Sequence, residues 1–122
     1  MILADTSLWV DHFRRGHPRF EAALQQNRIF THQVVIGELA TGNLGNRKHV
    51  LALLRRLPAV KSATADECLA FLESHRLYGR GVGWSDIQLL AAARLSKVML
   101  WTIDKRLAEA SRHLGVAFSH AN

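Results

Sequence analysis

Short apolar segments alternate with longer helical patterns along this chain, and this alternation restricts its fold more than any other feature. The clearest apolar segment is residues 98–103, where Val98-Met99-Leu100-Trp101 contains no charged or amide side chain. An unbroken apolar run is typical of a strand in a parallel sheet, because helices cover both faces of such a sheet. We therefore predict an α/β fold. The predicted strands are residues 2–4, 29–31, 60–63, 98–103 and 116–118.

The segments between these strands have the spacing of helices. Residues 48–57 place Val50 and Leu54 on one side and Arg55 on the other, as an amphipathic helix does. Residues 86–95 are apolar on almost every side, which indicates a helix buried in the core. Thr6 or Ser7 is the expected cap of the first helix.

The length and charge of the chain narrow the possibilities further. A chain of 122 residues fits one compact domain with one core, so we expect a single domain over residues 1–122. Sixteen Lys and Arg face ten Asp and Glu, a formal net charge of +6. A basic domain of this size favours nucleic acid or an acidic protein as partner. The alternative is a solvated surface that is merely rich in Lys and Arg.

The sequence also predicts the compartment. Cys68 is the single cysteine, so the chain cannot form an internal disulfide, and a reducing compartment is expected. No apolar stretch reaches the roughly 18 residues of a membrane span, and the N-terminus lacks the pattern of a secretory signal. We expect a cytoplasmic protein that does not enter a membrane.

Four acids occupy positions that suggest a common site. Asp5 and Asp104 each follow a predicted strand, and Asp86 begins a helical pattern after a glycine-rich loop. Glu38 lies within the apolar helical segment of residues 34–40, so we predict that its carboxylate points inward. Ligands of open parallel sheets bind at the carboxyl ends of the strands. Taken singly, each aspartate is more typical of a helix N-cap, but the combination indicates a cation site.

The chemistry of such a site follows from its charge. Two carboxylates about 4 Å apart repel by about 4 kcal/mol at an effective dielectric near 20, so clustered acids either bind protons or hold cations. Hard oxygen ligands favour magnesium or manganese, and such ions can activate a water and stabilise the leaving oxygen of a phosphodiester. Ser7 and Thr102 could support the acids through hydrogen bonds; local capping is the alternative.

The motifs together resemble those of the PIN-domain ribonucleases, and specifically the VapC-type toxins of bacterial type II toxin–antitoxin systems. Their order and spacing extend over essentially the whole chain. The matching pieces are Asp5-Thr6-Ser7-Leu8-Trp9, Glu38-Leu39, Gly83-Trp84-Ser85-Asp86 and Leu100-Trp101-Thr102-Ile103-Asp104-Lys105-Arg106-Leu107.

This resemblance implies a PIN-like three-layer α/β/α fold around a central, mostly parallel, five-stranded sheet. It also implies an endoribonuclease that depends on Mg²⁺ or Mn²⁺, in which Asp5, Glu38, Asp86 and Asp104 are both the catalytic acids and the metal ligands. A homodimer and a cognate antitoxin that blocks the site are implied as partners.

In one respect the chain departs from some members of the family. Those members carry an additional acid near the third one, whereas Ile87, Gln88 and Leu89 supply none here. We therefore expect one tightly held metal ion rather than two.

Other acidic α/β proteins fit the sequence less well. A phosphoacceptor receiver domain needs paired acids after its first strand, but position 6 is Thr6; a phosphatase with an Asp-x-Asp motif fails because position 7 is Ser7. A catalytically silent PIN-fold module that binds nucleic acid or a protein partner remains open, and metal binding separates it from an enzyme.

Overall fold

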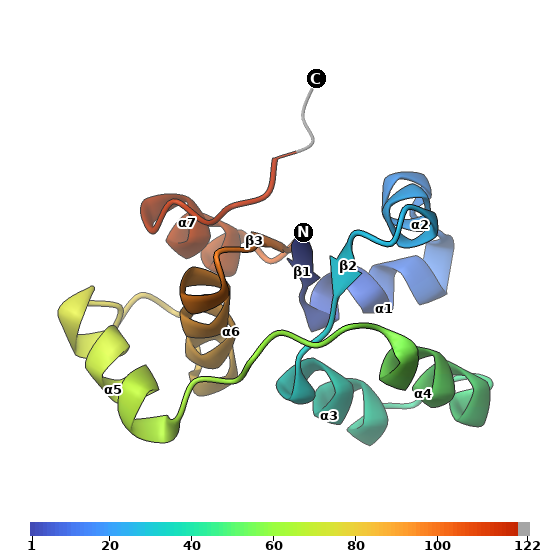
Figure 1. The fold of residues 1–122 in the computed structure, drawn as a ribbon, viewed down its shortest axis with the longest axis horizontal. Coiled ribbons are helices and arrows are strands. Elements are labelled where there is room, and N and C mark those ends of the chain that lie inside the picture. The colour runs from blue at the N-terminus through green and yellow to red at the C-terminus, as the bar shows by residue number, and fades with distance from the viewer. Residues whose placement is uncertain (120–122) are drawn as a thin grey trace.

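The computed structural model describes residues 1–119, which form three strands and seven helices (Figure 1). Their order along the chain is β1 (Ile2–Ala4), α1 (Thr6–Arg15), α2 (Pro18–Gln25), β2 (Ile29–Phe30), α3 (Gln33–Thr41), α4 (Arg47–Arg56), α5 (Ala65–Ser74), α6 (Trp84–Ser96), β3 (Met99–Trp101) and α7 (Lys105–His113).

The strands form one parallel sheet in the order β2-β1-β3, which confirms the predicted α/β fold with a parallel sheet. β1 is central, and its Ile2 lies opposite Ile29 on one side and Met99 on the other. All three residues of β1 are buried. Figure 1 shows this short sheet near the middle of the molecule with helices around it.

The predicted count of five strands is wrong for the described residues. The two outer segments are single parallel bridges, which pair Thr31 with Ala59 and Leu100 with Ala117. The bridge at Ala59 consists of two hydrogen bonds, both made by Thr31. Its N–H donates to the Pro58 carbonyl, and its carbonyl accepts the Val60 N–H. The segments predicted as outer strands thus lie at or next to these bridges, but each pairs over too short a stretch to form a strand.

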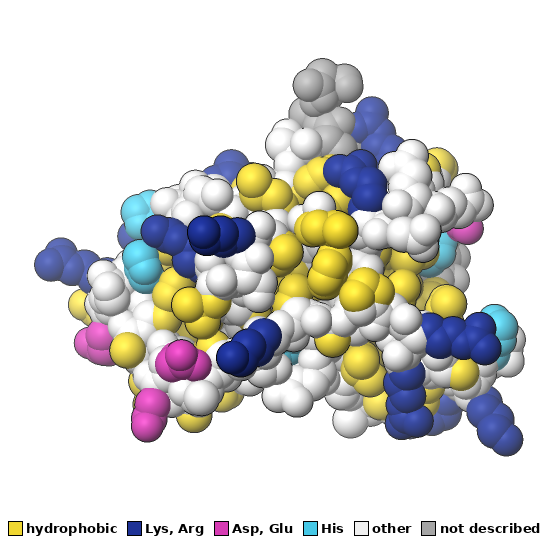
Figure 2. Space-filling view, viewed as in Figure 1, with side chains coloured by type: hydrophobic (Ala, Val, Ile, Leu, Met, Phe, Trp, Pro, Cys, Tyr) yellow, Lys and Arg dark blue, Asp and Glu magenta, His cyan; other side chains and the backbone are white. Residues whose placement is uncertain are grey.

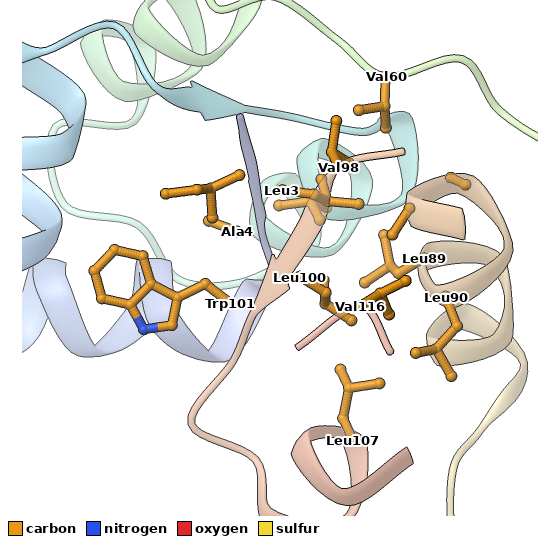
Figure 3. Close-up of a cluster of buried hydrophobic side chains, with 14 of the residues drawn as sticks. Leu3, Ala4, Val60, Leu89, Leu90, Val98, Leu100, Trp101, Leu107 and Val116 are labelled. Carbon is orange, nitrogen blue, oxygen red and sulfur yellow. The ribbon is translucent and has the colours of Figure 1, made fainter. Parts of the chain in front are cut away.

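Apolar side chains from the sheet and the helices around it pack into one core (Figure 3). Leu3 of β1 and Leu100 of β3 pack there with Leu89 of α6 and Leu107 of α7, all of them at most 1 % exposed. The prediction that the nearly all-apolar helix is buried is confirmed. The buried residues of α6 are Ile87, Leu89, Leu90, Ala91, Ala92 and Ala93.

Two helices begin almost directly at the carboxyl end of a strand. Asp5 alone separates β1 from α1, and its side chain caps the helix by accepting the Leu8 N–H. The predicted cap at Thr6 or Ser7 is therefore wrong, because the residue that ends the strand already fills that position. Asp104 caps α7 in the same way, accepting the N–H of Leu107. Strand ends and helix starts thus bring Asp5 and Asp104 to the same edge of the sheet.

The surface reflects the excess of basic residues. On the face shown in Figure 2, Lys and Arg side chains are scattered over much of the molecule, and acidic side chains gather mainly over α5. Among the described residues, no helix is long and apolar enough to span a membrane.

Candidate metal centre

Asp5 is the most buried acid of the predicted site, with 5 % of its surface exposed. Its Oδ1 accepts a hydrogen bond of 2.6 Å from the Ser7 hydroxyl and one of 3.3 Å from the Leu8 N–H, while its Oδ2 accepts one of 2.7 Å from the Thr102 hydroxyl. Both carboxylate oxygens therefore have partners, although none of these partners carries a positive charge.

Burial dominates the electrostatics of Asp5. It raises the pKa of this carboxyl above its usual range, because removal from water disfavours the charged form. The hydrogen bonds from Ser7, Thr102 and Leu8 act in the opposite direction, and the negative charge of Asp86 raises the pKa further. The charges of Asp5 and Asp86, which lie 81 positions apart in the sequence, thus interact in the folded protein.

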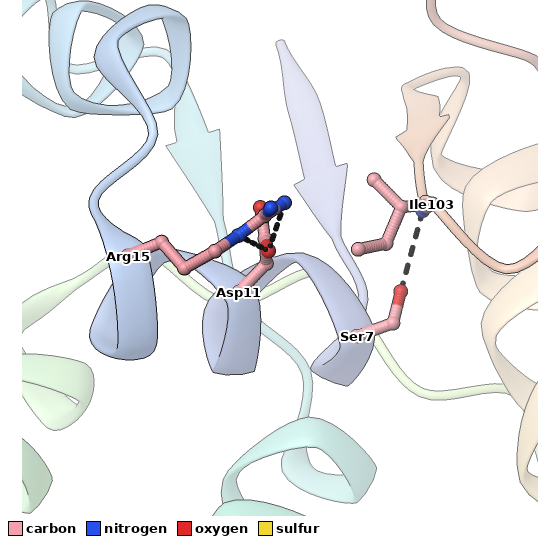
Figure 4. Close-up of polar contacts among 4 residues, drawn as sticks. All are labelled: Ser7, Asp11, Arg15 and Ile103. Atoms are coloured by element: carbon pink, nitrogen blue, oxygen red, sulfur yellow. Dashed lines mark hydrogen bonds and ion pairs between the residues drawn. The ribbon is translucent and has the colours of Figure 1, made fainter.

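Thr102 and Ser7 connect the acids at this edge of the sheet. The Thr102 hydroxyl donates to Asp5 and accepts the Asp104 N–H at 3.0 Å, so one side chain links two of the acids. The Ser7 hydroxyl lies 3.2 Å from that of Thr102 and accepts the Ile103 N–H at 3.3 Å (Figure 4). Both predicted supporting residues lie at the cluster, and local capping alone does not account for these contacts across the sheet.

Asp86 lies in the first turn of α6, half-buried, and its Oδ2 accepts the Gly83 N–H at 3.1 Å. Its pKa is raised, mainly by burial and also by the charges of Asp104 and Glu38, while the hydrogen bond from Gly83 lowers it. Asp86 is therefore the acid that interacts with all the others. Charge interactions thus connect Asp86 with each of the other three predicted acids, and the name acidic cluster is used for these four residues.

The prediction for Glu38 is wrong in one respect, because its side chain is exposed rather than directed into the core. Val35 and Leu39 form the buried side of α3, and Glu38 projects beside it. Its Oε1 accepts the Thr6 hydroxyl at 2.5 Å, and its Oε2 accepts the Ser85 hydroxyl at 3.2 Å. The carboxylate thus spans from α3 to the first turns of α1 and α6.

Sequence reasoning missed Thr6 and Ser85 as parts of this site. Thr6 was expected only as a possible cap, and Ser85 appeared only within a motif. The available signal was their position, because each hydroxyl residue directly neighbours one of the acids, Asp5 or Asp86.

Among the described residues, no ion pair involves an acid of the cluster. Within residues 1–119, the ion pairs join His12 to Glu21 at 3.8 Å and Arg15 to Asp11 at 2.8 Å, and both acids lie outside the cluster (Figure 4 draws the second pair). Asp5 and Asp86, whose pKa values are raised by burial and by neighbouring acids, thus have no paired cation among the described residues, which is the electrostatics of a site for an external cation.

The donor set suits a hard divalent ion, although the described residues do not form a complete shell. Among residues 1–119 there is no group of three or more His, Cys, Asp or Glu side chains arranged to hold a metal ion directly. Mg²⁺ does not require one, because it is usually bound through one or two carboxylates and keeps several waters. The residues therefore fit a largely hydrated ion better than a dry, closed site.

The histidine and the tryptophans near these segments differ in exposure. His32 is completely buried, and its Nδ1 caps α3 by accepting the Val34 N–H at 2.9 Å. Trp9 and Trp101 are buried in the core, whereas Trp84, at the start of α6, is 45 % exposed. Trp84 is thus an exposed aromatic residue in the same helical turn as Asp86.

Comparison with known proteins shows the family of the chain. The profile of the PIN domain matches residues 2–113, nearly the whole chain. The chain belongs to the PIN-domain family. It is also 41 % identical over 120 residues to Ribonuclease VapC32 of Mycobacterium tuberculosis, from strains CDC 1551 / Oshkosh and H37Rv alike. The alignment covers 98 % of this chain and 97 % of the relative, which makes the chain a VapC-type member of the PIN-domain ribonucleases.

A solved structure supports the fold independently. The crystal structure of FitAcB from Neisseria gonorrhoeae contains a chain that superposes with a TM-score of 0.65, at 21 % sequence identity. The match covers 96 % of this chain and 95 % of the other. At this identity the similarity concerns the fold alone.

Proposed function

We propose that this PIN-domain protein is a metal-dependent endoribonuclease toxin that cleaves phosphodiester bonds in RNA. One observation carries the proposal: Ser7 and Thr102 link Asp5 and Asp104 at the carboxyl edge of the sheet, the charge of Asp86 interacts with those of Asp5, Asp104 and Glu38, and within residues 1–119 no ion pair involves these acids. The family membership and the similarity to a ribonuclease of the VapC type support the same activity.

In this proposal Asp5, Asp86 and Asp104 hold a Mg²⁺ or Mn²⁺ ion, and Glu38 completes the acidic set. When bound, the ion lowers the pKa of a water and stabilises the charge that develops on the phosphodiester. Thr102 orients Oδ2 of Asp5 and holds the backbone N–H of Asp104, while Ser7 orients Oδ1 of Asp5. One tightly held ion is the expected number.

The proposal extends to organisation and partners. We take residues 1–122 as a single PIN domain with a three-layer arrangement, a protein that works in the cytoplasm as a homodimer. Its activity would be neutralised by a cognate antitoxin. The net charge of +6 suits both a polyanionic substrate and an acidic protein segment.

A catalytically silent module that binds nucleic acid or a partner is the second candidate. It is favoured by the lack of a group of three direct metal ligands among residues 1–119. The two candidates differ in whether RNA is cut when a divalent ion is added.

The test is cleavage of total cellular RNA by the purified chain in Mg²⁺ or Mn²⁺, in parallel with EDTA. The matched controls are Asp5→Asn, which changes the buried acid, and Asp11→Asn, which changes an acid outside the cluster. We expect discrete cuts with metal, no cuts in EDTA or with Asp5→Asn, and normal cuts with Asp11→Asn. End mapping of the products would then identify the RNA.

Two results would contradict the proposal. Cleavage that persists in EDTA and in Asp5→Asn would point to a contaminating nuclease. A chain that binds RNA but never cuts it, with either ion, would favour the silent module.

A further inference from the structure

Arg106 occupies a position that does not stabilise its own helix. It lies in the first turn of α7, together with Lys105, and that turn contains no acid. The positive end of the helix dipole lies at the N-terminus, so cations in the first turn are unfavourable there. The capping Asp104 compensates for part of this effect, but it is also a member of the acidic cluster.

The side chain of Arg106 lies closely against the glycine-rich loop that precedes α6. A Cβ atom on Gly81 would come within 2.5 Å of Arg106 Nη1 and within 2.6 Å of its Cδ. The φ angle of Gly81 is +80°, which also favours glycine. A bare backbone at this position therefore makes room for the guanidinium group and holds its stem in place.

A second arginine lies at the same place. Arg80 and Arg106 line a surface hollow of about 420 Å³, together with Glu109 and Ala110. Among residues 1–119, neither arginine has a hydrogen bond or an ion pair, so both guanidinium groups are available to a ligand. With Glu109 included, the hollow has a net charge of about +1, which suits a singly charged phosphodiester.

The two arginines of the hollow lie close in sequence to two acids of the cluster. The loop that carries Arg80 leads within six residues to Asp86, and Arg106 follows Asp104 by two residues. These two acids also interact electrostatically with each other. The arginines therefore come from the same two segments that supply half of the cluster.

We propose that Arg80 and Arg106 form a phosphate-binding subsite, which grips a backbone phosphodiester of the RNA strand next to the one being cleaved. This inference rests on the proposed ribonuclease function and deepens it. The planar guanidinium groups can each donate two hydrogen bonds to phosphate oxygens. The subsite positions the strand and takes no part in breaking the bond.

The test measures the binding of a fluorescein-labelled single-stranded oligoribonucleotide in EDTA, over a series of salt concentrations. For single strands the slope of log K against log[salt] changes by about 0.7 for each phosphate contact. We expect Arg106→Gln and Arg80→Gln each to reduce the slope by about that amount and to weaken binding about tenfold at low salt. Arg112→Gln, at the other end of α7, is the matched control and should leave the slope unchanged.

Kinetics on a mapped cleavage site provide a second reading. Loss of a contact made equally in the ground and transition states raises KM and leaves kcat unchanged. Arg106→Gln should therefore raise KM about tenfold and change kcat by less than about twofold. Arg106→Lys keeps the charge but loses the planar fork, so it should keep the salt slope and recover only part of the lost affinity.

The outcomes separate this inference from the proposed function. Equal salt slopes for the wild type, Arg80→Gln and Arg106→Gln would overturn the subsite even if the chain cuts RNA normally. A reduced slope in the two arginine variants would support the subsite even if no metal produced cleavage, in which case only the nuclease assignment would fail. A wild-type chain that does not bind the oligoribonucleotide would overturn the subsite as well.

Discussion

Asp5 and Glu38 belong to one acidic cluster, but the protein holds them in different ways. Asp5 is 5 % exposed and accepts hydrogen bonds from Ser7 and Thr102, so we refer to these three residues as the buried half of the site. Glu38 is exposed and accepts hydrogen bonds from Thr6 and Ser85, which with it form the exposed half. Each carboxylate has two hydroxyl partners, all four of which are half-buried, so the burial of the carboxylate itself is what distinguishes the halves.

This comparison separates the contributions of the site to stability and to activity. In the buried half, a carboxylate oxygen that loses its partner cannot turn to water, so the loss affects folding as well as function. In the exposed half, water replaces a lost hydroxyl, so the loss should affect mainly the position of the carboxylate. Substitutions at equivalent places in the two halves therefore test whether the division is real.

The largest effect is expected for the buried acid. Asp5→Asn removes the charge most enclosed by the protein and should reduce metal-dependent RNA cleavage by about 100- to 1000-fold, the range seen when one electrostatic group of an active site is lost. The measurement is kcat/KM on a mapped RNA substrate. Asp11→Asn, whose acid is paired with Arg15, should retain full activity. Equal losses in both variants would show that the effect is not specific to the cluster.

The next effect concerns the partner of the buried acid. Thr102→Val leaves Oδ2 of Asp5 without its 2.7 Å hydrogen bond and should lower the free energy of unfolding by about 1–3 kcal/mol. It should also weaken Mn²⁺ binding about 10- to 100-fold, because groups that orient metal ligands have effects of that size. Urea unfolding and Mn²⁺ titration provide the two values. Unchanged stability would mean that Asp5 does not depend on this bond.

The exposed half should respond less. Ser85→Ala removes the 3.2 Å hydrogen bond to Glu38 and should change the free energy of unfolding by no more than about 0.5 kcal/mol, because the carboxylate that loses this bond is exposed to water. Cleavage should fall by up to about tenfold, since the net contribution of one such hydrogen bond is about 1 kcal/mol. Activity and urea unfolding measured on the same preparation test this. A stability loss as large as that of Thr102→Val would remove the distinction between the halves.

The smallest effect concerns the pH dependence of the metal-free protein. The pKa of Asp86 is raised by burial and by the charges of Asp104 and Glu38, so the folded protein favours the protonated carboxyl. This contribution to stability is complete below the usual pKa of 3.8 and is lost as pH rises through the raised pKa of the folded protein. At pH 7 in EDTA, Asp86→Asn should therefore raise Tm by a few degrees, since solvent screening limits the gain to less than about 1 kcal/mol.

The same pH series contains its own control. The difference in Tm between Asp86→Asn and the wild type should shrink as pH approaches 3.8. A difference that grows on acidification would mean that ionised Asp86 is stabilised by a partner in the folded protein.

The sequence predicted the parts of the molecule that depend on local pattern. The apolar runs at Ile2–Ala4 and Met99–Trp101 are strands, and the nearly all-apolar segment that contains Leu89 is a buried helix. The sequence overstated the outer strands, because a short β-like segment such as the one around Val60 cannot reveal how many ladder bonds it makes. That number depends on where the chain turns away from its neighbour.

The site was predicted as a set of acids but not in its detailed arrangement. Helical spacing places Glu38 near Val35 and Leu39, and this spacing alone does not show that the helix turns the carboxylate toward Thr6 and Ser85. Thr6 and Glu38 are 32 positions apart, and Glu38 and Ser85 are 47 positions apart. Both contacts therefore depend on how three helices pack. Single-sequence patterns carry no information about that packing.

The central claim is that the four acids form one cation site, and titration of the metal-free protein with Mn²⁺, followed by calorimetry, tests it most directly. The account predicts one tight site in the wild type and in Asp11→Asn, and a large loss of affinity in Asp5→Asn and in Asp86→Asn. Equal Mn²⁺ affinity in the wild type and in both cluster variants would contradict it.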